Sequence, residues 1–416
     1  MLAIITTHPI QYQVPLWQAL ARDGRVPFEI WYLTDHGARI TRDKEFGRDF
    51  AWDLPLLEGY PHRFLKVNPD WVMDLVQPHR IRLAAPLTPL LRGKKVTHLM
   101  ITGWHKLAFW QAVRQARRAG VKVWLRGESN DLAPVPRWKR AVRRLVHGWL
   151  FRRVDEFLCI GQANRRLYEK AGVSAARLHW APYGVDNARF AAQAGPARAR
   201  RAEIRRQWGI AEDAFCVLFC GKLVAKKHPL DIVAAAQRLM DAAPARTPHL
   251  LYCGSGELGR ELRAATQVVF DRESPSSNPG PENVANFGPP ARPKASFLGF
   301  MNQTEISQAY VAADCLVLPS DYNETWGLVV NEAMASGLPC AVSDAAGCGE
   351  DLVAPLNPRL RFPLGDFAAL AAALGELRWH PPSRPALEAQ VAKYGLDVTV
   401  ETIAGLWRKS RTGLST

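Results

Sequence analysis

Short runs of apolar and β-branched residues alternate with longer amphipathic stretches along the first part of the chain. The runs are expected to be strands, at 3–7, 28–33, 98–102, 121–125 and 156–160. Stretches such as 106–119 and 164–172 separate these runs and have the pattern of helices. This alternation is typical of a parallel sheet with helices on both faces.

The same alternation begins again in the second part of the chain. Strands are expected there at 215–220, 249–253, 296–298, 315–319 and 340–343. At 416 residues the chain is long enough for two domains rather than one. We therefore expect an α/β fold with two doubly wound, Rossmann-like domains that face a central cleft.

The boundaries of these domains follow from shifts in composition. A stretch rich in Ala and Arg after Asp186 is interpreted as a linker, which gives an N-terminal domain at 1–190 and a C-terminal domain at 191–390. The segment 267–294, rich in Pro, Ser and Asn, is expected to be a surface insertion. The last part, 391–416, contains a helix-like stretch.

Two glutamates, Glu324 and Glu332, lie across an expected junction between a loop and a helix. Residues around Glu332 are apolar on nearly every helical face, so its carboxylate would be desolvated unless something hydrogen-bonds to it. A pair of ligand hydroxyls is one such partner, and the helix start offers backbone N–H groups to an anion. In the alternative interpretation, Glu332 pairs with a buried arginine and Glu324 caps the helix.

Two glycine turns follow expected strands in the second part of the chain. Gly221 comes directly before Lys222, with Lys227 five residues further on, and these lysines could neutralise a departing diphosphate. The alternative is that the lysines are only solvated. Gly254 and Gly256 form the second turn, which is consistent with the edge of a nucleotide-binding site.

The segment from Glu324 to Pro339 resembles the signature of the retaining glycosyltransferases of family 4, which have the GT-B fold. The resemblance implies transfer of a sugar from a nucleotide-sugar, with Glu332 on the ribose hydroxyls and Glu324 on sugar hydroxyls. It also implies that Lys222 and Lys227 stabilise the diphosphate, although the family usually has Arg at position 222. The backbone at five positions would touch sugar and phosphate, namely Thr325, Trp326, Gly327, Leu328 and Val329.

The same resemblance assigns the acceptor to the N-terminal domain. His8 and Gln11 follow the first expected strand, in place of the glycine-rich loop that such enzymes usually have there. His105 follows another strand and is a candidate contact of the transferring sugar, although a structural histidine is the alternative. Glu128 stands near the position where many members have a histidine. The C-terminal helix is expected to cross back to the N-terminal domain, as in other GT-B chains.

The net charge of +15 is concentrated in part at 137–153, which holds seven cations and no acid, interleaved with large apolar residues. Such a helix suits an anionic membrane surface, and its candidate contacts are Arg137, Lys139, Arg140, Arg143 and Arg144. In the alternative, its apolar face belongs to the core and its cations are only solvated. No nucleic-acid-binding module is recognisable in the sequence.

Other features narrow the location and the chemistry. Seven cysteines without paired spacing favour a reducing compartment, and no stretch has the length of a membrane span. We therefore expect a cytoplasmic protein, with peripheral association at the inner face of the membrane as a further hypothesis. Because the sequence has no Asp-x-Asp motif, no metal ion is expected. No cofactor is expected either, since the nucleotide-sugar donor is a substrate.

The function predicted from these features is transfer of a sugar to a glycan or to a lipid-linked acceptor. Two alternatives stay open, a UDP-sugar epimerase of GT-B fold and a non-catalytic basic protein of membrane surfaces. A dinucleotide-dependent oxidoreductase is disfavoured because the first strand is not followed by the Gly-x-Gly-x-x-Gly pattern.

Overall fold

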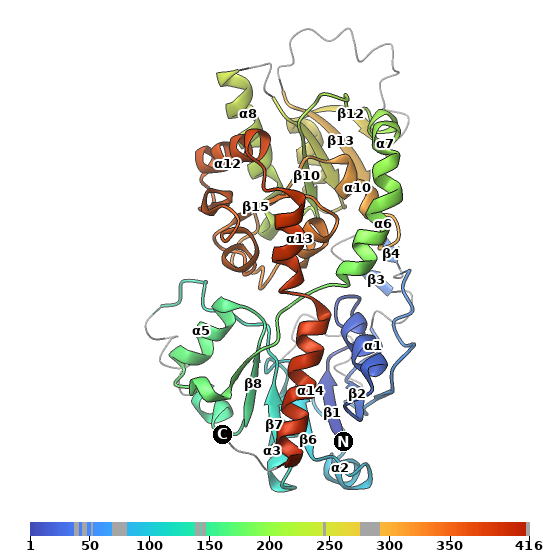
Figure 1. Ribbon diagram of the computed structural model, residues 1–416, viewed down its shortest axis with the longest axis vertical. Helices are drawn as coiled ribbons and strands as arrows, with labels where there is room; N and C mark the ends of the chain where they lie inside the picture. Colours follow the sequence, from blue (N-terminus) through green and yellow to red (C-terminus); the bar gives the residue numbers. More distant parts are fainter. Residues whose placement is uncertain are drawn as a thin grey trace. The chain divides into compact units, whose positions relative to one another are not determined.

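The chain forms two compact units in the computed structural model (Figure 1). The structure describes residues 1–36, 41–43, 48–50, 53–68, 81–136, 138, 143, 147–243, 247–274 and 292–412. Unit 1 contains Met1–Thr41, Leu54–Val185 and Gly395–Thr416, and unit 2 contains Arg42–Asp53 and Asp186–Tyr394. The main boundary thus falls at Val185, five residues before the position expected from composition.

Unit 1 is built on a parallel sheet of seven strands in the order β5-β2-β1-β6-β7-β8-β9. The strands are β1 (Leu2–Thr6), β2 (Phe28–Tyr32), β5 (His62–Phe64), β6 (His98–Ile101), β7 (Lys122–Leu125), β8 (Glu156–Cys159) and β9 (Leu178–Trp180). The five strands predicted for this part are confirmed. The edge strands β5 and β9 were not predicted, because three residues are too few to show a hydrophobic period.

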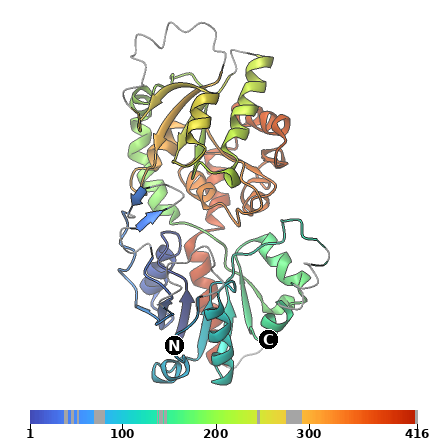
Figure 2. The ribbon, with the colours of Figure 1, turned by 180° about the vertical axis from the view of Figure 1, so that it is seen from behind.

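Helices cover both faces of the unit 1 sheet (Figures 1 and 2). They are α1 (Val14–Asp23), α2 (Thr88–Gly93), α3 (Leu107–Arg118), α5 (Gln162–Lys170) and α14 (Leu396–Thr412). Two adjacent residues of β6 point to opposite faces of the sheet. Leu99 belongs to the hydrophobic core that includes Phe109 of α3, whereas the ring of His98 lies 5.2 Å from the ring of Trp407 in α14. All five residues of β1 are buried for the same reason.

Unit 2 repeats the architecture with a parallel sheet in the order β12-β13-β11-β10-β14-β15-β16. Its strands are β10 (Cys216–Cys220), β11 (His249–Cys253), β12 (Gln267–Asp271), β13 (Lys294–Gly299), β14 (Cys315–Leu318), β15 (Cys340–Ser343) and β16 (Arg361–Phe362). The five predicted strands are again confirmed. The proposed insertion at 267–294 is wrong at both ends, because β12 and the start of β13 pair within the sheet.

The helices of unit 2 surround this sheet. They are α6 (Asn187–Ala199), α7 (Arg201–Gln207), α8 (Pro229–Ala242), α9 (Gly259–Ala265), α10 (Ser307–Ala312), α11 (Leu328–Ala335), α12 (Phe367–Trp379) and α13 (Arg384–Ala392). Short helical turns occur at Ala225–Lys227, Gly349–Val353 and Pro358–Leu360, and the short strands β3 (Thr41–Asp43) and β4 (Arg48–Phe50) pair with each other.

The linker predicted after Asp186 is wrong, since α6 and α7 occupy it (Figure 1). Ala and Arg are strong helix formers, and the Asp186 carboxylate caps α6 by accepting from the backbone N–H of Arg189 at 3.0 Å. Arg201 and Arg205 of α7 both pair with Asp314, at 2.6 and 3.3 Å. The basic residues therefore anchor a packed helix.

The strand order reverses at the first strand of each sheet. In unit 1 this point lies between β1 and β6, and in unit 2 it lies between β10 and β14. Ligands of doubly wound sheets bind outside the carboxyl ends of the strands at such a reversal. Residues that directly follow these four strands are therefore the first candidates for a functional site.

Candidate active site

Glu332 lies inside unit 2, on α11, with 3% of its surface exposed. The Tyr310 hydroxyl donates to its carboxylate at 2.5 Å, and the Gln303 amide approaches it at 3.5 Å. Burial raises the pKa of Glu332 from 4.5 to about 7, and these two neighbours and the charge of Arg189 only partly offset the effect. Near neutral pH this carboxyl group is therefore protonated in part of the molecules and charged in the rest.

The alternative in which Glu332 pairs with a buried arginine is not what the structure shows. Arg189 donates instead to the side chain of Gln303, at 2.8 Å, so the only direct partners of Glu332 among the described residues are neutral. The Tyr310 hydroxyl also lies 3.8 Å from the thiol of Cys220, the last residue of β10. The buried acid is thus placed beside the end of the strand where the order reverses.

Glu324 follows β14 and forms an ion pair with Lys227, which follows β10. The side chain of Glu324 is 16% exposed and that of Lys227 is 23% exposed, so the ion pair is partly buried and still reaches water. Glu324 does not cap α11, because the residue at the N-cap position is Gly327, which has no side chain to bond to the first turn. The pair joins the two strand ends at the reversal point.

The loop between Glu324 and α11 has a conformation that only glycine fits. Gly327 has a φ of 103°, and a Cβ atom there would lie 2.5 Å from a side-chain carbon of Leu318. A Cβ atom at Gly347 would lie 2.1 Å from the carbonyl oxygen of Thr325, and the Cys348 N–H donates to the Trp326 carbonyl at 2.9 Å. The segment after β15 therefore holds this loop in place.

The first turn of α11 leaves backbone N–H groups without helical partners, which favours an anion. Leu328 and Val329 are half-buried at this turn, whereas Thr325 is exposed. The Trp326 ring belongs to the core, because its Nε1 donates to Asn331 at 2.8 Å. A ligand could therefore contact the backbone of Trp326 but not its ring.

The glycines after β10 and β11 bring two turns of backbone together. Gly221 and Leu223 donate N–H bonds to the carbonyls of Cys253 and Ser255, at 2.9 and 3.0 Å. A Cβ atom at Gly254 would lie 2.0 Å from the Gly221 carbonyl oxygen, and one at Gly256 would lie 2.5 Å from that of Leu223. This packing by itself explains why both are glycine. The half-buried Lys222 lies on one of the two turns.

A polar network occupies the carboxyl ends of the unit 1 strands. The Thr102 hydroxyl donates to Thr6 at 3.0 Å, and that of Thr6 donates to the Gln13 carbonyl oxygen at 2.9 Å. Glu128 accepts from Gln13 at 3.3 Å and from the Tyr183 hydroxyl at 2.5 Å. Gln13, rather than the predicted Gln11, therefore connects the loop after β1 to Glu128, and the buried Gln11 lies in the same loop.

Two histidines predicted for the acceptor side follow β1 and β6. His8 is half-buried, and its ring lies 5.3 Å from that of His36. Burial, together with the charges of His36 and Lys106, lowers the pKa of His8 from 6.5 to about 4. His105 is exposed, with its ring 6.0 Å from Phe109.

Of the basic residues proposed for a membrane surface, Arg143 is described and exposed. The others, Arg137, Lys139, Arg140 and Arg144, lie outside the described residues. In the described part of the chain, no helix has the length and apolar character needed to cross a membrane, and no cluster of three His, Cys, Asp or Glu side chains could hold a metal ion. All seven cysteines are free thiols.

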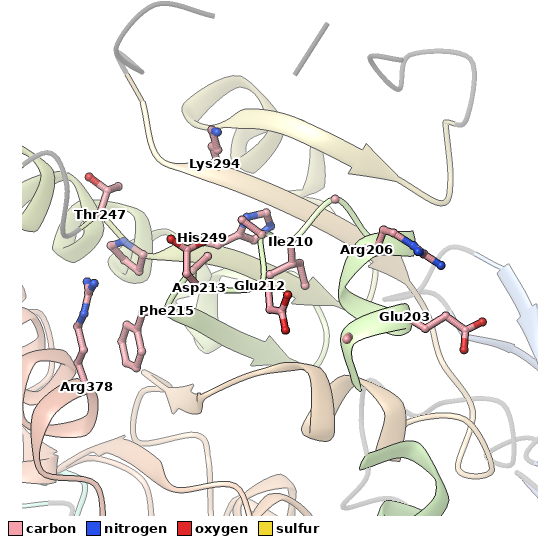
Figure 3. Close-up of a pocket in the computed structure, with 15 residues that line it drawn as sticks. Glu203, Arg206, Ile210, Glu212, Asp213, Phe215, Thr247, His249, Lys294 and Arg378 are labelled. Carbon is pink, nitrogen blue, oxygen red and sulfur yellow. The ribbon is translucent and has the colours of Figure 1, made fainter. Parts of the chain in front are cut away.

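A hollow of about 790 Å³ lies at the opposite edge of the unit 2 sheet (Figure 3). It is lined near the starts of three strands by Phe215, His249 and Lys294, together with charged side chains such as Glu212 and Arg378. None of the candidate residues lines this hollow. It is therefore separate from the carboxyl edge.

Comparison with known families identifies the class of protein. Residues 11–184 match the glycosyl transferase 4-like domain, and residues 214–378 match glycosyl transferases group 1. The two matches cover most of both units, and the chain belongs to the family 4 glycosyltransferases of GT-B fold.

Individual relatives are more distant. The chain is 29% identical over 243 residues to the D-inositol 3-phosphate glycosyltransferase of Thermomonospora curvata, covering 58% of this chain and 53% of that protein. It thus spans about half the length of this relative. The glycogen synthase of Mycobacterium tuberculosis is 27% identical over 344 residues, with 79% of this chain and 67% of that protein covered.

Among solved structures, HepE of Anabaena in complex with UDP superimposes with a TM-score of 0.65 at 15% identity, covering 98% of this chain and 99% of that one. At this identity the likeness shows the fold alone.

Proposed function

We propose that this protein is a retaining glycosyltransferase that moves a sugar from a nucleoside-diphosphate sugar to a glycan or a lipid-linked acceptor. The observation that carries the proposal is the buried Glu332, which lies beside the strand reversal of unit 2. Among the described residues, the direct hydrogen-bond partners of its carboxylate are all neutral. Burial of a charged acid without a charged partner lowers the stability of the fold. Such acids are therefore found preferentially at binding sites.

Glu332 is suited to the ribose of the nucleotide. Two neighbouring hydroxyls can each donate to one carboxylate oxygen, and these bonds favour the charged form of the acid. Nucleotide binding should therefore lower the pKa of Glu332 from about 7 and release a proton near neutral pH. Tyr310 and Gln303 orient the carboxylate for this task.

The diphosphate and the sugar are assigned to the neighbouring groups. Lys222, Lys227 and the first turn of α11 supply positive charge on one side of Glu332. A bound diphosphate would compete with Glu324 for Lys227, which would leave the Glu324 carboxylate to accept bonds from sugar hydroxyls.

The proposed reaction takes place on one face of the sugar. The bond between the anomeric carbon and the phosphate oxygen breaks, and the acceptor oxygen bonds to the same face of that carbon. The acceptor proton passes to the departing phosphate, so the configuration is retained without a protein nucleophile. Among the candidate residues, Glu324 and Glu332 are the only carboxylates of unit 2, and both are assigned to binding.

A panel of nucleotide-sugars, beginning with UDP-glucose, tests this assignment. HepE of Anabaena was solved with UDP and with UDP-glucose, which makes uridine nucleotides the first choice. Glu332→Gln should weaken nucleotide binding by at least about tenfold, since hydrogen bonds to a charged group are lost. Glu324→Gln should retain nucleotide binding and lose transfer. Glu212→Gln, at the opposite edge of the sheet, is the matched control.

Unchanged nucleotide binding in Glu332→Gln would overturn the assignment of the ribose site. Formation of an epimer from the nucleotide-sugar without any acceptor would instead identify an epimerase. Peripheral membrane association is part of the same proposal and is supported by the cation-rich sequence at 137–153. Replacing Arg140, Arg143 and Arg144 by Gln should abolish binding to anionic liposomes, and unchanged binding would refute it.

A further inference from the structure

Asp53 is part of unit 2, although it stands in the chain between β2 and β5 of unit 1. Its exposed carboxylate accepts from the backbone N–H of Gln303 at 3.2 Å, and from the backbone N–H and the hydroxyl of Thr304 at 3.0 and 2.5 Å. These two N–H groups belong to a turn that begins at Asn302 and leads into α10. Asp53 therefore caps this turn from a distant part of the sequence.

The capped turn and α10 carry both hydrogen-bond partners of Glu332. Gln303 belongs to the turn and Tyr310 belongs to α10. The backbone N–H groups at the start of a helical segment have no partners within it, and a carboxylate that accepts from them holds the first turn in place. The contacts of Asp53 therefore fix the segment that supplies both donors to the buried acid.

Arg189 of α6 holds Gln303 through other atoms. Its guanidinium donates to the side-chain oxygen of Gln303 at 2.8 Å and to the backbone carbonyl of Gln303 at 3.4 Å. A guanidinium can only donate, so the amide oxygen of Gln303 meets Arg189 and the amide nitrogen faces Glu332. Asp53 thus fixes the backbone of Gln303, and Arg189 fixes the orientation of its amide.

We propose that Asp53 is a positioning residue of the nucleotide site, which acts on Glu332 through Gln303 and Tyr310. This inference deepens the proposed function and rests on it, because Glu332 is the acid assigned to the ribose hydroxyls. Those hydroxyls donate to the charged carboxylate, and Gln303 and Tyr310 stabilise the same charged form before the nucleotide binds. Loss of the cap should loosen the turn, weaken both bonds and leave a smaller share of the molecules ready to bind at neutral pH.

The sign of the expected change separates positioning from simple electrostatics. Removal of the negative charge of Asp53 would by itself favour the charged form of Glu332 and lower its pKa. Weaker bonds from Gln303 and Tyr310 would instead raise the pKa of Glu332 above its value of about 7. A higher pKa of Glu332 in an Asp53 variant is therefore evidence that Asp53 acts by holding the two donors.

Other groups around Glu332 do not obscure this change. Arg189 acts on Glu332 through its charge, which it keeps at every pH of the test. The Cys253 thiol at the end of β11 is also a neighbour, and its hydrogen bond with Cys220 together with burial holds its pKa well above the usual range. A titration near pH 7 that is lost in Glu332→Gln therefore reports on Glu332.

Nucleotide binding measured against pH tests the inference on the whole chain. The probe is UDP-glucose, whose diphosphate does not titrate near neutral pH. The wild type is compared with Asp53→Ala, Asp53→Asn and the control Asp366→Ala. Asp366 caps α12 of unit 2 by accepting from the backbone N–H groups of Ala368 and Ala369 at 3.0 and 2.9 Å. The control thus removes an equivalent cap from a different helix.

The affinity of the wild type should rise with pH around pH 7, because the charged Glu332 is the binding form. In Asp53→Ala the rise should move to higher pH by about 0.5, which lowers affinity about threefold at pH 6, about twofold at pH 7 and little at pH 8. Asp53→Asn should recover most of the wild-type curve, since Asn caps helices as well as Asp does. Asp366→Ala should follow the wild-type curve even if its Tm falls.

An unchanged curve in Asp53→Ala, or one that moves to lower pH, would overturn the inference. An equal shift in Asp366→Ala would overturn it too, because the effect would then come from stability alone. The double variant Asp53→Ala/Glu332→Gln should show no such shift, since Glu332 can no longer titrate. A shift that remains in the double variant would show that Asp53 does not act through Glu332.

Failure of the proposed function would have a different signature. An NMR titration of the glutamate side-chain carboxyl carbons follows Glu332 without nucleotide, and its signal is identified by its absence from Glu332→Gln. A higher pKa of Glu332 in Asp53→Ala, together with UDP-glucose binding that does not depend on Glu332, would refute the ribose site and leave the positioning role standing. Loss of binding in Glu332→Gln, together with an unchanged pKa of Glu332 in Asp53→Ala, would refute the positioning role alone.

Discussion

The carboxyl edges of the two sheets share a topology and differ in chemistry. Each sheet has seven parallel strands with a reversal beside its first strand, and each edge has a glutamate that accepts from a tyrosine hydroxyl at 2.5 Å. In unit 2 that acid, Glu332, is sealed from water, whereas Glu128 of unit 1 is half-buried. Topology thus sets where a ligand can bind, and the side chains at the strand ends set which ligand it can be.

The two edges also use the backbone differently. In unit 2, glycines let the turns after β10 and β11 meet backbone to backbone, and the first turn of α11 offers backbone N–H groups to an anion. In unit 1, the loop after β1 has no glycine and presents His8 and Gln13. Recognition by backbone groups is therefore expected in unit 2, and recognition by side chains in unit 1.

The largest expected effect comes from adding a methyl group to a glycine at each edge. Gly254→Ala should destabilise unit 2 by more than about 3 kcal/mol, because its Cβ would overlap the Gly221 carbonyl at a φ of 138°. Gly103→Ala, after β6 of unit 1, should cost less than about 1 kcal/mol, since its nearest neighbour is the ring of the exposed His105 at 3.2 Å and not backbone. Chemical denaturation measures both, and equal losses would contradict the contrast.

An intermediate effect is expected when the sealed acid loses its charge. The folded-state pKa of Glu332 is raised from 4.5 to about 7, so the folded protein binds the extra proton and this group costs stability as pH rises through that window. Glu332→Gln should therefore stabilise the empty protein by on the order of 3 kcal/mol at pH 8, and by little at pH 4. Unfolding curves at the two pH values measure this, and a gain that is independent of pH would contradict the assignment.

The smallest effect compares the two tyrosines. Tyr310→Phe should cost about 1–2 kcal/mol at pH 8, because the charged form of the sealed Glu332 loses its best donor. Tyr183→Phe should cost less, about 1 kcal/mol, since the half-buried Glu128 can turn to water and retains its bond from Gln13. Urea unfolding at pH 8 decides the order, and a larger loss for Tyr183→Phe would reverse our comparison.

Much of the fold could be predicted because burial on both faces produces apolar runs. All ten strands predicted from such runs belong to the two sheets. The edge strands β5, β9 and β16 are too short to show a pattern. The shift to Ala and Arg after Asp186 predicts a linker, but both residue types also favour helices, and the chain forms α6 and α7 there.

The candidate site was predictable only in part. The family signature located Glu324, Glu332 and the glycine at 327, and the structure brings Glu324 and Lys227 together. Gln303 and Tyr310, which hold Glu332, lie 29 and 22 residues before it, on elements without any motif.

By itself, the sequence determined the two series of strands, the family and the two acids, because each of these leaves a local record in hydrophobic period or motif. Only the tertiary structure decided which residues satisfy those acids and which glycines serve backbone packing. Hydrogen-bond partners and burial depend on contacts between distant segments that the crossovers of a doubly wound sheet bring together, and no local pattern encodes such contacts.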